Sequence, residues 1–216
     1  MTKKAWIILG GIFAGLVALS AGGAGGGDFY LEYRNASWLR EALASYDKGE
    51  WARAKGYFER YLPQDPRNAE LLEKYANASM KLDYDRLGSL RAAVTAYQQI
   101  LTYHPDREDV RQHLIDLYIK LSAWSTLDYY TRDWLRRTPG NQAILYYNAL
   151  ALDNMGSLDD AMKGYEELIA KNTDRSDVYG SYARLLREKG LEAKANEIFV
   201  NARAARPQDG QIVADY

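Results

Sequence analysis

The sequence predicts an all-α protein made of about five stacked helix–turn–helix repeats, an α-solenoid, preceded by a single N-terminal transmembrane-type helix. Two observations lead to this fold class. Residues 5–27 contain no charged side chain, whereas both signs of charge run through the rest of the 216 residues. The second observation is a repeated pattern of small and bulky residues. The segments that carry it end at Pro66, Pro105, Pro139, Thr173 and Pro207.

The first element is the apolar segment at residues 5–24. About 20 helical residues cross the ~30 Å hydrocarbon core of a bilayer, so this segment is long enough to span it. Lys3 and Lys4 precede it, and basic residues favour the cytoplasmic side. We therefore expect a single-pass helix in a bacterial plasma (inner) membrane, with a cytoplasmic N-terminus and an extracytoplasmic, periplasmic repeat domain. The side chains expected in the membrane are Trp6, Ile7, Ile8, Leu9, Ile12, Phe13, Leu16 and Val17.

Two further interpretations of this segment stay open. A cleaved signal peptide also begins with basic residues, continues with an apolar stretch and ends near small residues such as Ser20. Alternatively, Gly10, Gly11 and Gly15 suit a helix buried in a protein assembly, where small residues allow close packing. The glycine-rich run at residues 22–27 is a poor helix interior and predicts a flexible joint that closes an N-terminal region at 1–27.

The repeat itself is read from residues four positions apart, which share one face of a helix. In four of the five units a small residue precedes a bulky one at this spacing, and the units end at intervals of 39, 34, 34 and 34 residues. The pairs are Ala54/Phe58, Ala93/Tyr97, Leu127/Thr131, Ala161/Tyr165 and Ala195/Phe199. A glycine precedes the second helix of four units, at Gly49, Gly88, Gly156 and Gly190.

This pattern resembles the tetratricopeptide repeat family, whose unit is a 34-residue helix–turn–helix with small residues where the paired helices meet. The third unit departs from it, with Leu127 and Thr131 in place of alanine and an aromatic residue. The resemblance implies a right-handed solenoid within a domain at 28–207, followed by a tail at 208–216. The expected repeats are 34–66, 69–105, 107–139, 141–173 and 175–207.

In that family the first helix of each repeat lines a groove. The resemblance therefore implies that side chains on the first helices, pointing away from the second helices, bind a protein partner. Counting helical positions gives Leu39, Leu43, Tyr46, Asn77, Met80, Gln112, Tyr146, Leu150, Arg184 and Arg187 as partner-binding residues. Aromatic residues and arginine, the usual energetic centres of interfaces, mark this set.

Composition and motifs predict no catalytic residue, cofactor or metal. The chain has 28 Lys and Arg against 29 Asp and Glu, so no basic surface for nucleic acid is expected. The absence of cysteine excludes disulfides, zinc–thiolate sites and a thiol nucleophile. His113 lies near Asp109 and Asp116, but one histidine beside exposed carboxylates is better explained as a solvated surface. We expect no small-molecule substrate.

Two functions follow from these features. The first is a non-catalytic, membrane-tethered scaffold or adaptor, serving as an accessory subunit or assembly factor of a larger complex on the extracytoplasmic side. The alternative is a structural subunit of a homopolymeric filament or tube, held together by the N-terminal helix and the stacked repeats. The partners would then be either membrane subunits or copies of the protein itself.

Overall fold

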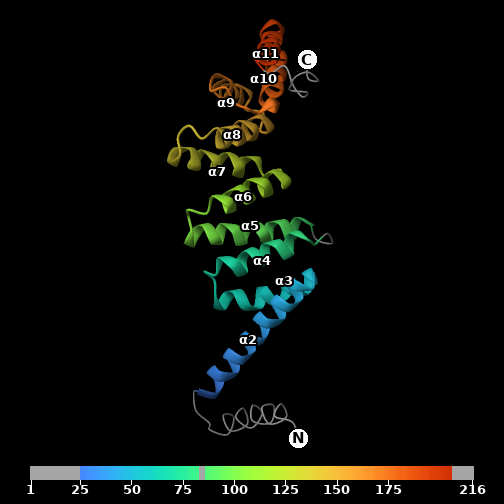
Figure 1. Cartoon of the computed structure of the whole chain (residues 1–216), viewed down its shortest axis with the longest axis vertical. Coiled ribbons are helices and arrows are strands. Elements are labelled where there is room, and N and C mark those ends of the chain that lie inside the picture. Colours follow the sequence, from blue (N-terminus) through green and yellow to red (C-terminus); the bar gives the residue numbers. More distant parts are fainter. Residues whose placement is uncertain (1–24, 83–85, 206–216) are drawn as a thin grey trace. The chain divides into compact units, whose positions relative to one another are not determined.

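A computed structural model describes residues 25–82 and 86–205, and all of its regular structure in these ranges is helical, with ten α-helices and no strand (Figure 1). The chain divides into two compact units, unit 1 up to Leu114 and unit 2 from Ile115 onward. The boundary lies inside the helix α6 (Glu108–Lys120). The all-α prediction is confirmed for the part of the chain that the structure describes.

Unit 1 is built from helix pairs that pack through small residues. Ala42 and Ala54 are fully buried and belong to the first pair, and the fully buried Ala76 and Ala93 belong to the second. Such side chains let two helices approach closely. Bulky partners, among them Phe58, fill the space beside them. The helices are α2 (Gly25–Asp47), α3 (Trp51–Tyr61) with the 3₁₀ turn η1 (Leu62–Gln64), α4 (Ala69–Met80) and α5 (Arg86–Tyr103).

Unit 2 continues the same design, with each helix packed on the next one along the chain. Alanines again lie at the helix contacts, and the aromatic rings of Tyr165, Tyr182 and Phe199 fill the core between them. The helices after α6 are α7 (Trp124–Arg137), α8 (Gln142–Asn154), α9 (Leu158–Ala170), α10 (Ser176–Glu188) and α11 (Glu192–Ala205).

The turns within the helix pairs use the left-handed backbone conformation, which ends a helix and suits glycine. Gly49, Gly156 and Gly190 adopt φ values of 73°, 77° and 75°. In the divergent third repeat Ser122 takes this conformation, with φ of 50°. The turn geometry is therefore kept where its usual residue is absent.

Gly88 does not form the turn that the sequence predicted. It lies within the first turn of α5, which begins at Arg86 and runs for 18 residues, against 11 in α3. The five extra residues of the 39-residue interval that ends at Pro105 therefore accompany a longer α5. The sequence could not reveal this because a single glycine is tolerated near a helix start.

Two of the first helices are capped by asparagine side chains. The serine at the start of α9, Ser157, makes no side-chain capping bond. Instead, two asparagines cap first helices: Asn68 accepts a hydrogen bond from the Leu71 amide, and Asn141 accepts one from the Ile144 amide. Asparagine at this position satisfies an amide that the helix itself leaves unpaired.

The structure describes only part of the N-terminal region for which the sequence predicted a membrane helix and a flexible joint. The joint expected at residues 22–27 is wrong in its described part, because α2 begins at Gly25 and continues without a break. Among the described residues, no helix combines the length and apolar character needed to cross a bilayer. The predicted membrane helix at 5–24 and the tail at 208–216 lie outside the described residues.

The divergent third repeat contains a buried polar network between α7 and α8. The Asn148 side-chain amide donates to Asp128 Oδ1 and to Thr131 Oγ1, both at 3.0 Å. Asp128 also accepts from the Arg132 guanidinium, with 2.7 Å to Nε. Thr131 is fully buried, and its hydroxyl donates to the Leu127 carbonyl at 2.8 Å. Thr131 stands at the position of the aromatic residue in the other repeats. Its hydrogen bonds take the place of the apolar contact that the aromatic ring makes there.

Candidate protein-interaction surfaces

In unit 1, the predicted partner-binding residue Tyr46 packs against two aromatic rings. The Tyr46 ring meets Trp51 and Phe58 edge-on, with centroids 5.4 and 6.2 Å apart. Lys74 Nζ lies 5.4 Å from the Tyr46 ring centroid. Tyr46 remains half-buried, so one part of its ring packs inward and another part stays open to a partner.

Arg107 joins the surface of α4 to the start of α6. Its Nη2 atom donates to Glu73 Oε1 and Asp109 Oδ2, both at 2.6 Å. The side-chain hydrogen bonds from Arg107 lower the pKa of Asp109 to about 2. The carboxylate therefore stays charged at neutral pH, and the three side chains form a fixed charged cluster.

A second cluster in unit 1 surrounds Tyr97. Its hydroxyl lies 3.4 Å from Asn77 Oδ1, and its ring stacks on His113 with centroids 5.3 Å apart and an interplanar angle of 26°. Burial, and secondarily the nearby Glu73 charge, raises the pKa of Tyr97 to about 12. His113 is thus a stacking residue, and no group of side chains in the described part of the chain is arranged to hold a metal ion.

In unit 2, Tyr146 belongs to the core more than to an open groove. Its side chain is 8% exposed, and its hydroxyl donates to Asp177 Oδ2 at 2.7 Å. The Arg175 guanidinium carbon lies 3.6 Å from the ring centroid. Burial and the hydrogen bond to Asp177 raise the pKa of Tyr146 to about 12. This predicted anchor therefore offers little surface to a partner.

Arg184 and Arg187, predicted to bind a partner, are paired with carboxylates. Arg184 Nη2 donates to Asp153 Oδ2 at 2.5 Å, and its Nη1 donates to Glu188 at 2.6 Å. Arg187 lies 3.7 Å from Glu192. The two arginines are exposed, as expected, but they do not form a free positive patch. The sequence missed this because the carboxylates come from other turns or from a neighbouring helix.

The remaining predicted groove residues lie on first helices and keep part of their surface open. No partner is present, so partner binding by these residues stays a prediction. The half-buried members are Leu39, Leu43, Asn77, Met80, Gln112 and Leu150.

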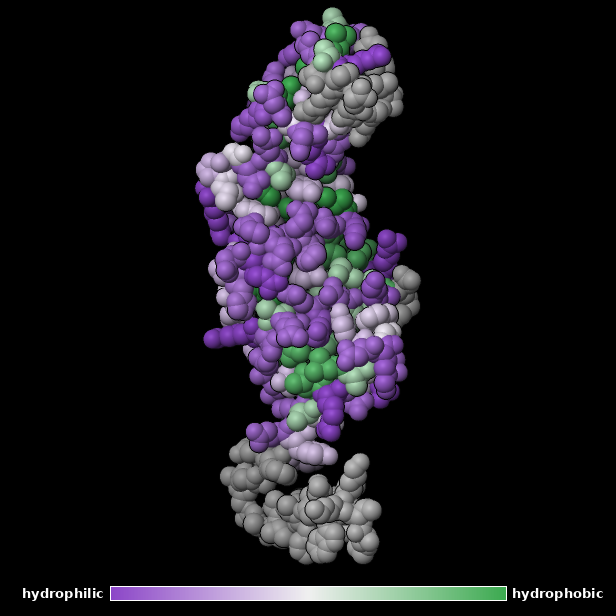
Figure 2. All heavy atoms as spheres, viewed as in Figure 1, coloured by the Kyte–Doolittle hydropathy of each residue, from purple (hydrophilic) through white to green (hydrophobic). Residues whose placement is uncertain are grey.

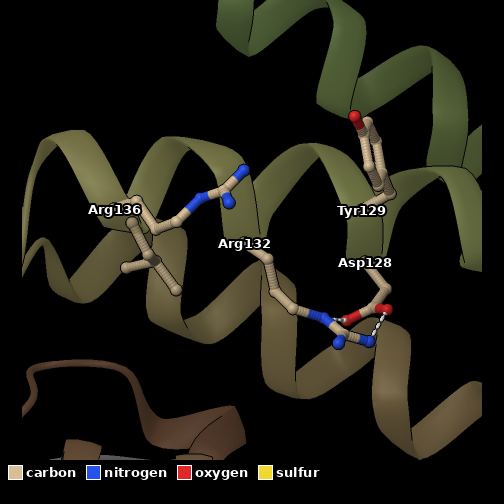
Figure 3. A pocket seen from close by; sticks show the side chains of 5 residues that line it. Asp128, Tyr129, Arg132 and Arg136 are labelled. Carbon is tan, nitrogen blue, oxygen red and sulfur yellow. Dashed lines mark hydrogen bonds and ion pairs between the residues drawn. The ribbon is translucent and has the colours of Figure 1, made fainter.

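A surface pocket of about 580 Å³ lies along the second helix α7. Figure 3 shows that Tyr129 points to the opposite side of the helix from Asp128 and Arg132, so its lining side chains do not converge. Arg132 is bound to Asp128, and Arg136 donates to Asp133 at 2.7 Å. The pocket therefore lacks the convergent polar groups of a small-molecule site.

Figure 2 shows a mainly hydrophilic exterior with one larger hydrophobic cluster near α3 and smaller hydrophobic patches elsewhere. Among the exposed large hydrophobic residues are Tyr30 and Tyr33 on α2 and Tyr129 on α7. Adjacent residues on a helix point in different directions, and Tyr129, next to the half-buried Tyr130, is 74% exposed.

These helix pairs, with buried small residues at their contacts and left-handed turns between them, form a helical repeat fold of the tetratricopeptide type. No protein-family model matches the chain, and no curated protein matches it. Several solved structures are similar to it in fold. A crystal structure of MamA superposes with a TM-score of 0.59 and 18% identity, covering 81% of this chain and 92% of MamA. A MamA chain from Desulfovibrio magneticus RS-1 that begins at its residue 41 superposes with a TM-score of 0.56 and 15% identity, and the match covers 82% of this chain and 97% of that one. At these identities the likeness shows the fold alone.

Proposed function

We propose that the protein is a non-catalytic scaffold that binds a protein partner through the surfaces of its first helices. The observation that carries this proposal is a set of bonds between the first helices of successive repeats. In unit 1, Arg107 at the start of α6 is bonded to Glu73 on α4, and in unit 2, Arg184 on α10 is bonded to Asp153 on α8. Side chains of neighbouring repeats are thereby held in one arrangement.

These bonds matter for recognition more than for stability. Exposed ion pairs typically contribute only about 0–1 kcal/mol to folding. Binding, in contrast, loses free energy when flexible side chains must be ordered, so a surface ordered in advance binds more tightly. The Tyr46 ring, held between Trp51 and Phe58, adds a rigid aromatic contact of the kind that dominates interface energies.

The proposal extends to location. The apolar residues 5–24 and the preceding Lys3 and Lys4 support a single membrane tether, with the repeats on the extracytoplasmic side of a bacterial plasma membrane. The protein would then be an accessory subunit or assembly factor that keeps its partner near the membrane.

The test is co-purification of partner chains with the full chain in mild detergent. Arg184→Ala removes the bond to Asp153 on the first-helix surface. Lys194→Ala is its matched control, because Lys194 forms an ion pair with Glu166 at 3.2 Å between two second helices. We expect the partner yield to fall several-fold for Arg184→Ala and to stay unchanged for Lys194→Ala, with equal melting temperatures.

Equal partner yields from both variants would contradict binding through the first helices. If no chain co-purifies with the wild-type protein, the scaffold function is wrong. If the only chain recovered is the protein itself, the result supports the homopolymer alternative in place of an adaptor.

A further inference from the structure

The first half of α2 lies beyond its partner helix. α2 has 23 residues and α3 only 11, and Figure 1 shows the start of α2 extending away from α3. Tyr30 and Tyr33, in this extension, are 63% and 64% exposed. Tyrosines this open are uncommon in the described chain, where most aromatic rings pack in the core. The extension therefore presents an amphipathic aromatic surface that α3 does not cover.

An arginine lies on the same surface. The guanidinium carbon of Arg34 is 4.7 Å from the Trp38 ring centroid and 6.0 Å from that of Tyr30. Residues 30, 34 and 38 are four apart and share one helix face. Among the described residues no carboxylate forms an ion pair with Arg34, and its buried Nε atom has no hydrogen-bond partner there. By contrast, Arg53 on α3 is bonded to Glu41 at 2.9 Å.

We propose that this face of α2 lies in the phospholipid headgroup layer, with Tyr30 and Tyr33 as interfacial anchors and Arg34 as a donor to lipid phosphate. The proposal rests on the membrane tether proposed above. The apolar residues 5–24 come directly before α2, so the chain that would enter the hydrocarbon ends where this helix begins.

The dimensions place Tyr30 at the outer edge of the headgroup layer, and Tyr33 reaches back toward it through its side chain. At 1.5 Å per residue, Tyr30 lies about 8 Å along the helix from Gly25 and Tyr33 about 12 Å. Each headgroup layer is about 5–8 Å thick, the difference between the whole bilayer and its core. Tyrosine side chains in a helix lean toward its N-terminus, which brings both rings closer to the layer.

The chemistry agrees as well. Tyrosine and tryptophan are enriched at both membrane interfaces, because one end of each ring is apolar and the other polar. Trp6 occupies the corresponding position at the other end of the apolar segment. A guanidinium forms charge-assisted hydrogen bonds with phosphate oxygens, so a lipid phosphate is a suitable acceptor for Arg34.

The test uses the absence of cysteine, which makes a single labelling site possible. Leu31→Cys, 44% exposed, leaves Tyr30, Tyr33 and Arg34 intact and is labelled with a nitroxide in the full chain. The chain is reconstituted into vesicles of phosphatidylethanolamine and phosphatidylglycerol. Vesicle flotation reports the tether, and collisional relaxation by oxygen and by a water-soluble nickel complex reports the depth of the label.

We expect the label at position 31 to be several-fold less accessible to nickel than a label on Tyr129→Cys, the matched exposed site in unit 2. Adding Arg34→Gln should raise nickel accessibility at position 31. If the protein floats and the two labels are equally accessible, the headgroup contact is wrong and the tether stands. If the protein does not float, both proposals are wrong. No effect of Arg34→Gln would overturn the role of that arginine.

Discussion

Gly164 in α9 lies so close to Ala149 in α8 that a Cβ atom added to the glycine would be 2.9 Å from the Ala149 Cβ atom. Ala149 is fully buried, and its methyl group is fixed to a helix backbone. Both Cβ atoms would be attached directly to helix backbones, so neither could move away by a change of rotamer. The two helices of this repeat therefore require glycine at this position.

Gly164→Ala should lower the free energy of unfolding of the protein. Overpacking costs about 1–3 kcal/mol, and the better helix propensity of alanine returns less than about 1 kcal/mol. Gly56→Ala is the control, because a Cβ atom there meets nothing within 4 Å, so it should stabilise α3. Urea denaturation followed by circular dichroism measures both. Equal shifts of the two variants would contradict the close contact.

Asn148→Ala should destabilise unit 2. The substitution removes the amide that donates to Asp128 and Thr131, and it leaves a buried carboxylate short of one donor. Leaving a buried polar group unsatisfied costs about 1–3 kcal/mol. Asn154→Ala serves as the comparison, since its amide donates to a carbonyl at an exposed site. Thermal melting should separate the two variants, and a harmless Asn148→Ala would argue against the network.

Ser122→Gly should stabilise the protein. Ser122 holds φ of 50° at a turn where three other repeats have glycine. The left-handed conformation costs a residue with a Cβ atom roughly 1 kcal/mol, which glycine avoids. The opposite kind of substitution at the equivalent turn of another repeat, Gly156→Ala, should destabilise the protein by a similar amount, because Gly156 adopts the same conformation. The midpoints of urea denaturation report both, and a Ser122→Gly variant less stable than wild type would contradict the assigned turn.

Alkaline pH should weaken the fold through buried tyrosines. The pKa of Tyr97 and that of Tyr146 are both raised from 10.0 to about 12, mainly by burial. The unfolded chain therefore releases these protons first. Their contribution to stability is complete below pH 10 and is lost as the pH rises toward 12.

The measurement is a series of melting temperatures between pH 9 and pH 12. Lysines also titrate in this range, so the Tyr97→Phe, Tyr146→Phe double variant is the reference. We expect melting temperature to fall more steeply with pH for the wild type than for the double variant. Parallel curves would show that these two hydroxyls do not carry the effect.

Much of the local structure follows from spacing alone. Ala54 with Phe58 and Ala161 with Tyr165 lie four residues apart, and the structure buries all four, because such spacing places both side chains on one helix face. Gly164 was not singled out, although it sits beside this pair. Its role depends on the distance to α8, and no pattern within α9 contains that distance.

The candidate interaction surface was less accessible to sequence reasoning. Arg184 was expected to bind a partner, yet it is bonded to Asp153, 31 residues earlier. Tyr146 was expected as an open anchor, yet Asp177 and its neighbours enclose it. Each partner comes from the next repeat along the chain or the one before. Their pairing depends on how far the helices are rotated about their axes, which periodicity does not report.

The order of small, bulky and turn-forming residues was enough to predict an all-helical repeat protein, since backbone conformation and helix pairing depend on short-range sterics and hydrophobic burial. The packed helices decided three further properties. These are which charges are paired, which aromatic rings remain exposed and which glycine cannot be replaced. Those properties arise from distances between residues about 15 to 34 positions apart in the chain, and only the tertiary structure brings such residues together.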